Sequence, residues 1–144
     1  MDQKIEEQGI SRRTALCALS LISAGIFTSA ESAVAATGVK VLSNGKVQVT
    51  LKSNPALKKV GGVVRIDDVK GKSIALVRTS TKSYTAVNLL CTHLGGQLFQ
   101  TGNQWQCDEH GATFTLAGKN LVGPATTALK QLPVKVTASV VTIG

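Results

Sequence analysis

Short stretches of alternating hydrophobic and polar residues recur from about residue 46 to residue 144. Residues 46–51 are the plainest example, because Val47, Val49 and Leu51 alternate with polar residues and so share one face of an extended strand. After residue 35, no segment places apolar residues at the spacing of an amphipathic helix. The pattern therefore predicts an all-β domain, with further strands at residues 62–66, 73–77, 84–89, 97–99, 104–106, 134–137 and 140–143.

Polar and glycine-containing turns separate the predicted strands. Residues 67–72, Asp-Asp-Val-Lys-Gly-Lys, predict one hairpin turn, and Thr101-Gly102-Asn103 predicts another. Ala138 and Ser139 join the last two strands into a closing hairpin. The chain is 43% hydrophobic but only 3% aromatic, so its core must be mainly aliphatic. We expect the lone aromatics Phe99 and Trp105 to pack in that core rather than to contact a cofactor.

The first 35 residues have a different pattern and are predicted to form a signal segment before a single domain at residues 36–144. Residues 11–16 read Ser-Arg-Arg-Thr-Ala-Leu, a twin-arginine pattern, and an uncharged run follows at residues 14–30. Ala33-Val34-Ala35 resembles a cleavage site for a signal peptide. We therefore expect export to the periplasm by the twin-arginine route.

Two fates of the signal segment stay open. Cleavage after Ala35 would release a soluble domain and remove Cys17, which we interpret as a small apolar residue of the signal. Alternatively, residues 14–30 remain as an uncleaved membrane anchor. This run of seventeen residues contains five hydroxyl side chains, so its length and composition are marginal for spanning a bilayer.

The net charge of the predicted mature domain is strongly positive. Residues 36–144 contain thirteen Lys and Arg against four Asp and Glu, a balance of +9. Nucleic acid is excluded as a partner, because the cations are scattered and aromatic residues for stacking on bases are nearly absent. We interpret the charge as favouring solubility and attraction to a redox partner protein with an acidic docking face or to an anionic membrane surface.

Four residues with metal-binding side chains gather in two short segments. Cys91 and His93 form a Cys-x-His pair, and Cys107 and His110 form a Cys-x-x-His pair. These pairs contain both histidines of the protein and two of its three cysteines. Thiolate and imidazole are ligands of structural zinc sites and of iron–sulfur centres. We therefore predict a metal site in which two loops each supply one sulfur and one nitrogen.

This pair of loops resembles the ligand loops of the Rieske iron–sulfur proteins, in which two cysteines bind one iron of a [2Fe-2S] cluster and two histidines bind the other. The resemblance implies that Cys91 and Cys107 bind one iron, and that His93 and His110 bind the other. One [2Fe-2S] cluster is the implied cofactor. The implied fold is an antiparallel β-sandwich with a small cluster-binding subdomain formed by the two loops.

The residues around the implied ligands extend the resemblance, which runs from about Gly62 to the end of the chain. Gly95 and Gly111 match glycines that stand beside the ligands in the family. Residues 123–125, Gly-Pro-Ala, resemble the proline-containing third loop that covers the cluster. Leu94 is a candidate for an apolar rim around the histidines, although it would equally suit the space beneath the loop.

Four positions depart from the pattern of the quinol-oxidising members of the family. Those members carry an additional, disulfide-bonded cysteine in each loop, where this chain has Gly96 and Glu109. They also have a serine and a tyrosine that donate hydrogen bonds to the cluster and to a cysteine sulfur. The matching residues here are Ala112 and Phe114, which have no side-chain donor. The resemblance therefore implies a disulfide-lacking type outside the high-potential branch.

Three classes of function remain open at this stage. The first is a one-electron carrier of the periplasm with no catalytic residues of its own. The second is the small Rieske subunit of an exported oxidoreductase, such as an arsenite-oxidase-like or quinol-oxidising complex. The third is a structural zinc module that binds a partner. A Rieske oxygenase is set aside, because the chain leaves no residues from which to build its second, mononuclear iron domain.

Overall fold

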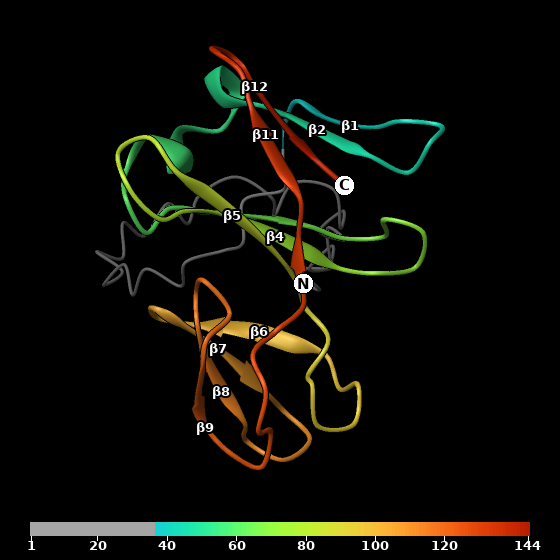
Figure 1. Ribbon diagram of the computed structural model, residues 1–144, viewed down its shortest axis with the longest axis vertical. Helices are drawn as coiled ribbons and strands as arrows, with labels where there is room; N and C mark the ends of the chain where they lie inside the picture. The colour runs from blue at the N-terminus through green and yellow to red at the C-terminus, as the bar shows by residue number, and fades with distance from the viewer. Residues whose placement is uncertain (1–36) are drawn as a thin grey trace, which may run out of the picture. The chain divides into compact units, whose positions relative to one another are not determined.

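Twelve short strands form three antiparallel sheets of four strands each in the computed structural model, which describes residues 37–144 (Figure 1). The predicted twin-arginine pattern, uncharged run and cleavage site lie outside these residues. The all-β prediction is confirmed, because the only helical elements in the described part are two 3₁₀ turns. Among these residues, no helix has the length and apolar character needed to cross a membrane.

The first and second sheets pack as a β-sandwich. The first sheet has the order β1-β2-β12-β11, formed by β1 (Val39–Val41), β2 (Val47–Thr50), β12 (Val140–Ile143) and β11 (Val134–Val136). The second sheet has the order β10-β5-β4-β3, formed by β10 (Gln131–Leu132), β5 (Tyr84–Asn88), β4 (Ile74–Arg78) and β3 (Val63–Ile66). Between β2 and β3 the chain makes the 3₁₀ turns η1 (Leu51–Ser53) and η2 (Pro55–Lys58).

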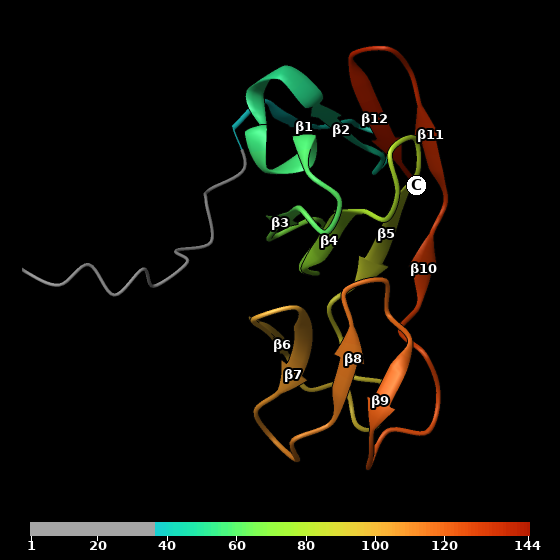
Figure 2. The ribbon, with the colours of Figure 1, turned by 90° about the vertical axis from the view of Figure 1, so that its left-hand side faces the viewer.

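The third sheet belongs to a subdomain on the other side of the second sheet (Figure 2). Its order is β6-β7-β8-β9, formed by β6 (Leu98–Thr101), β7 (Gln104–Cys107), β8 (Thr113–Thr115) and β9 (Asn120–Val122). The predicted hairpin across residues 101–103 is confirmed as the β6–β7 pair. The subdomain therefore contains a complete sheet as well as the two loops expected from the sequence.

The second sheet contributes to two hydrophobic cores, one on each face. Ile74 and Leu76 of β4 pack toward the first sheet, in a core that also contains Val47 and Ile143. Ala75 and Val77 of the same strand pack toward the third sheet, around Trp105. Because successive side chains of a strand point to opposite faces, a continuous apolar run such as residues 74–77 is buried on both sides.

Several elements escaped prediction or differ from it. The four strands that were not predicted (β1, β8, β9 and β10) have only two or three residues, too few to display an alternating pattern. The strand expected at residues 46–51 ends at Thr50, where the chain turns into η1. Trp105 is fully buried, as expected, and donates its indole N–H to the Leu116 carbonyl at 3.0 Å.

The expectation that Phe99 packs in the core is wrong. Its side chain is 45% exposed, and the guanidinium carbon of Arg65 lies 5.5 Å from the centre of its ring. The same guanidinium donates to the Leu98 carbonyl at 2.7 Å and forms an ion pair with Asp67 at 2.8 Å. Arg65 of β3 thus connects the sandwich to β6, and Phe99 covers this connection from outside.

Candidate metal centre

The two loops that carry the predicted ligands have the same backbone hydrogen bonds. In the first loop, residues 91–96, the Cys91 N–H donates to the Gly96 carbonyl at 2.8 Å, and the Gly95 N–H donates to the Cys91 carbonyl at 2.9 Å. In the second loop, residues 107–112, the Cys107 N–H donates to the Ala112 carbonyl at 2.9 Å, and the Gly111 N–H donates to the Cys107 carbonyl at 3.0 Å. Each loop is therefore a closed six-residue turn that begins at a cysteine.

Glycine is required at the fifth position of each turn. Gly95 has a φ of +80° and Gly111 a φ of +72°, values in the left-handed region that residues with a β-carbon rarely adopt. β5 leads into the first loop, and the second loop connects β7 to β8. The strands thus fix the ends of the turns. Gly95 and Gly111, which the sequence places beside the predicted ligands, are the residues that close the two turns.

The two cysteine side chains lie together in the core beneath the loops. Cys91 is 4% exposed and Cys107 is 2% exposed, and neither forms a disulfide. Burial raises the pKa of the Cys91 thiol, and the neighbouring Cys107 thiol raises it further, whereas N–H donors from His93 and Leu94 act in the opposite direction. The thiolate is the form that binds a metal, and a metal cation compensates its charge in a buried site.

The two histidines lie at the exposed end of the loops. The centres of the His93 and His110 rings are 4.9 Å apart, and the ring planes meet at 89°. Both side chains are exposed, in contrast to the cysteines. The nearest charged neighbour is Glu109, whose carboxylate oxygen lies 4.0 Å from Nδ1 of His110. The four predicted ligands therefore form a buried pair of sulfurs and an exposed pair of imidazoles.

This donor set fits a [2Fe-2S] cluster, because such a cluster takes its ligands as one pair per iron. Among residues 37–144, no group of three or more His, Cys, Asp or Glu side chains is arranged to hold a single metal ion. The observed separation into two sulfurs and two imidazoles is the division of ligands expected from the sequence. The residues present thus match the chemistry of the implied cofactor.

A third loop, residues 123–127, is attached to the first by a hydroxyl group. The Thr92 Oγ1 donates to the Thr127 carbonyl at 2.8 Å, and the Asn120 side-chain amide donates to the Ala125 carbonyl at 2.8 Å. The Gly123–Pro124 peptide bond is cis. The sequence identified this loop by its proline, but it gave no sign of Thr92, because residues 92 and 127 are 35 positions apart.

Leu94 is 69% exposed, so it does not fill the space beneath the first loop. Its position beside His93 agrees with the apolar rim that the sequence indicated. Ala112 and Phe114, which match the two hydrogen-bond donors of quinol-oxidising proteins, are fully buried in the core that contains both cysteines. Neither residue brings a side-chain donor toward the sulfurs.

Gly96 and Glu109, the residues at the positions of the absent cysteines, face each other across the two loops. A β-carbon built on Gly96 would lie 2.8 Å from the Cys107 sulfur and 2.9 Å from the Glu109 carboxyl carbon. Contacts this short do not occur with real β-carbons, so a residue larger than glycine must displace the Cys107 side chain or the Glu109 carboxylate. Gly96 therefore lets the two loops approach closely, a role that the sequence alone did not reveal.

The Gly96→Ala variant should accordingly be less stable than the parent. Overpacking a buried site costs about 1–3 kcal/mol, and here the added methyl group presses directly on the Cys107 sulfur. Chemical denaturation followed by circular dichroism would measure the loss. Gly123→Ala is the matched control, because its β-carbon would meet only the Ala125 carbonyl oxygen, at 3.9 Å. Equal stability of the Gly96 variant and the parent would contradict the close approach.

A comparison with protein families gives a match over more than half of the chain. The family model described as "Rieske [2Fe-2S] domain" matches residues 46–133, which include both ligand loops and the third loop. Among curated proteins, the cytochrome b6-f complex iron-sulfur subunit of Chlorobaculum tepidum is 41% identical over 56 residues, 38% of this chain. The match spans 31% of the length of that relative.

Solved structures with a similar fold include two kinds of protein. The cyanobacterial plasma membrane Rieske protein PetC3 from Synechocystis PCC 6803 has a TM-score of 0.53 and 28% identity, over 66% of this chain and 94% of its own. The quaternary ammonium Rieske monooxygenase CntA also gives a TM-score of 0.53, at 20% identity, over 63% of this chain and 30% of its own. At 20% identity, the similarity to CntA is a similarity of fold alone.

Proposed function

Because the chain belongs to the family of Rieske [2Fe-2S] domains, we propose that it carries single electrons between redox partners in the periplasm. Its cofactor is one [2Fe-2S] cluster. The observation that carries the proposal is the separation of the donor set, in which the sulfurs are buried and the imidazoles are exposed. Such a site opens toward a partner protein, because its imidazole end lies at the surface.

We assign the four ligands as Cys91 and Cys107 for one iron and His93 and His110 for the other. When bound, the cluster supplies a one-electron couple. The cysteine side chains hold their end of the site within the core, where the backbone N–H groups of His93 and Leu94 donate toward the Cys91 sulfur. The hydrogen-bonded turns fix the histidines at the surface, so that the imidazole edges are presented to a partner beside the exposed side chains of Leu94, Asp108 and Glu109.

The docking surface for that partner has a local charge opposite to that of the domain. The first and second loops contain Asp108 and Glu109 but no Lys or Arg, although residues 36–144 have a charge of +9. The dispersed cations attract an acidic partner over distance, whereas close contact is made by Leu94, the imidazoles and two carboxylates. We propose that the partner has an acidic surface overall and an apolar or basic contact around its own redox group.

A second candidate function is that of a small Rieske subunit in a larger exported oxidoreductase. It is favoured by the similarity to the Chlorobaculum tepidum iron-sulfur subunit, whose name places that protein in a cytochrome b6-f complex. Isolation of the tagged protein from its native membrane and soluble fractions distinguishes the two. A stoichiometric cytochrome or catalytic subunit would support the subunit function, and an isolated brown protein would support the carrier.

The alternative of a structural zinc module is tested by measuring the zinc, iron and sulfide content of the protein. A structural zinc module requires one zinc and no sulfide, whereas the cluster requires two irons and two acid-labile sulfides. The family match favours the cluster. Elemental analysis and the visible spectrum of the purified protein would settle which metal is bound, because only the iron–sulfur centre is coloured.

The reduction potential of the cluster should lie in the lower part of the Rieske range, roughly −150 to +300 mV, and below about +100 mV. A hydrogen-bond donor to a cluster sulfur stabilises the reduced cluster more than the oxidised one, by about 1 kcal/mol. About 1.4 kcal/mol corresponds to roughly 59 mV for one electron. The two donors absent at Ala112 and Phe114 therefore lower the potential by about 50–100 mV. Asp108 and Glu109 act in the same direction, because negative charge disfavours an added electron.

Voltammetry on the parent, Ala112→Ser and Phe114→Tyr proteins checks this expectation. Each substitution should raise the potential, since both positions are buried among the cysteines. Phe99→Tyr is the matched control, because it adds the same hydroxyl group to an exposed ring beside Arg65 and should leave the potential unchanged. A parent potential above about +200 mV, well inside the upper part of the family range, or no rise in either variant, would refute the argument.

A further inference from the structure

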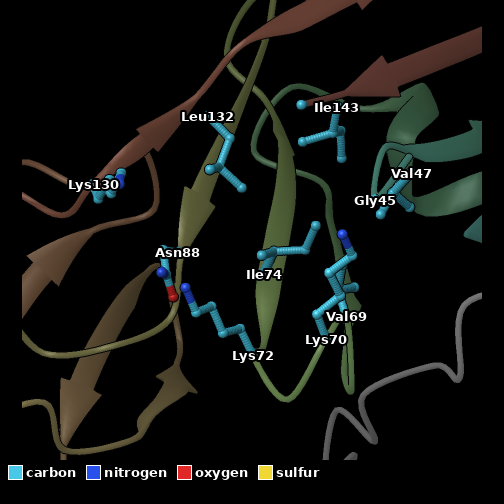
Figure 3. Close-up of a pocket in the computed structure, with 11 residues that line it drawn as sticks. Gly45, Val47, Val69, Lys70, Lys72, Ile74, Asn88, Lys130, Leu132 and Ile143 are labelled. Carbon is cyan, nitrogen blue, oxygen red and sulfur yellow. The ribbon is translucent and has the colours of Figure 1, made fainter. Parts of the chain in front are cut away.

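A cavity of about 230 Å³ lies between the first and second sheets, outside the residues assigned to the cluster (Figure 3). Its apolar wall comes from both sheets: Val47 and Ile143 from the first, and Ile74 and Leu132 from the second. A dry cavity of about 150 Å³ is sufficient to hold a benzene molecule. This cavity therefore has room for a single ring or a short aliphatic chain with one polar group.

Three lysines line the cavity, and none of them forms an ion pair with an acidic side chain of residues 37–144. Lys70, Lys72 and Lys130 line it together with the apolar side chains, and no Asp or Glu side chain does. The ion pairs among the described residues join Arg65 to Asp67 and His110 to Glu109. The three ammonium groups thus form no ion pair within the described part of the chain. An organic anion would supply the missing charge.

The backbone holds Lys70 over the cavity in an uncommon conformation. Lys70 and Gly71 form a two-residue turn with φ values of +53° and +73°, closed by hydrogen bonds between Val69 and Lys72 of 2.9 and 3.2 Å. Turns of this kind favour Asn, Asp or Gly at the first position. A β-carbon on Gly45 would lie 2.5 Å from Nζ of Lys70, so the missing side chain of Gly45 makes room for the ammonium group.

Asn88 adds an unused hydrogen-bond acceptor to the same cavity. Its Oδ1 atom is buried and has no hydrogen-bond partner among the described residues. In Figure 3 the side chain of Lys72 extends toward Asn88 from the opposite side of the cavity, without a hydrogen bond between them. Buried polar atoms are nearly always satisfied. The Oδ1 atom therefore requires a donor that a ligand with a hydroxyl group would provide.

We propose that this cavity binds a small hydroxylated organic carboxylate. The carboxylate lies among Lys70, Lys72 and Lys130, the ring or chain packs on the apolar wall, and the hydroxyl group donates to Asn88 Oδ1. The residues that line the site come from separate segments of the chain and converge only in the folded sandwich. None of the proposed iron ligands lines the cavity, so binding here is separate from the electron-transfer function.

Calorimetric titration of the cluster-loaded protein with 3- and 4-hydroxybenzoate tests the proposal, with benzoate and benzyl alcohol for comparison. One of the hydroxybenzoates should bind more tightly than benzoate, and uncharged benzyl alcohol should bind most weakly. The Lys70→Gln/Lys72→Gln protein should lose affinity for the hydroxybenzoate by roughly tenfold, since each exposed charge pair contributes modestly. Lys82→Gln, an exposed lysine outside the cavity, should bind as the parent does.

The Asn88→Leu protein separates the role of the hydroxyl group from that of the charge. It should bind benzoate about as the parent does but lose the preference for the hydroxylated acid. An unchanged cluster spectrum in every variant shows that a loss of binding does not arise from a lost cofactor. The proposal is overturned if neither hydroxybenzoate binds at millimolar concentration, if the lysine variant binds as well as the parent, or if Lys82→Gln weakens binding equally.

Discussion

Replacing any one of the four proposed ligands by alanine is expected to abolish cluster binding, the four being Cys91, His93, Cys107 and His110. The iron bound by the substituted residue then retains a single protein ligand, while the other iron keeps both of its own. Because binding of such a centre is coupled to the folding of its site, loss of one ligand removes the whole group. Iron and acid-labile sulfide should fall to background, and the brown colour should disappear.

The cysteine and histidine variants should differ in what remains. The cysteines are almost fully buried in the core, so their removal also leaves a small cavity, whereas the histidines are exposed at the surface. Apo protein with the histidine substitutions should therefore unfold at the same denaturant concentration as apo parent. Asp108→Asn, between Cys107 and His110, is the matched control and should keep its iron. A variant with full iron content and the native spectrum would remove that residue from the ligand set.

Changing Arg12 and Arg13 together to lysine is expected to stop export and to leave the precursor in the cytoplasm. A twin-arginine signal is recognised by a receptor, so lysines that conserve the positive charge do not conserve recognition. Fractionation of cells that express parent and variant would measure the effect. Lys4→Gln, which removes a charge from the same segment, should be exported normally. Normal export of the double variant would exclude this route.

A separate measurement shows whether the predicted signal segment is cleaved. N-terminal sequencing of the exported protein should find a first residue near Ala36 if cleavage follows Ala35. An intact N-terminus in the membrane fraction would indicate instead that residues 14–30 act as an anchor. The domain boundary at residue 35 stays a prediction until that experiment, because the described structure begins at residue 37.

Local sequence was sufficient to predict the ligand candidates and most of the strands. Cys91 and His93 lie in one turn, and Cys107 and His110 lie in another. Each pair can therefore be recognised from neighbouring residues alone. β2, β3 and β4 were predicted because each places apolar residues on a buried face. Such patterns arise from burial within one element, and a sequence displays them directly.

Features that depend on distant pairs were not predictable. Thr92 finds its acceptor in Thr127, and Gly96 is constrained by Cys107 and Glu109, although nothing at these positions signals the contact. Phe99 was expected in the core because aromatic residues usually pack there, yet Arg65 provides an outer surface for it. The four strands that were not predicted form because a neighbouring strand offers hydrogen bonds, not because their own pattern requires it.

The second sheet, buried on both faces, limits how far this redox centre can be transplanted as a module. A graft of residues 90–129 would carry both ligand loops and the third sheet, but it would leave behind Ala75, Val77, Val87 and Leu89, which close the core beneath the cysteines. The transplanted sheet would then expose that apolar surface to water. The smallest segment that can be grafted with its core intact therefore includes β4 and β5 as well as the ligand loops.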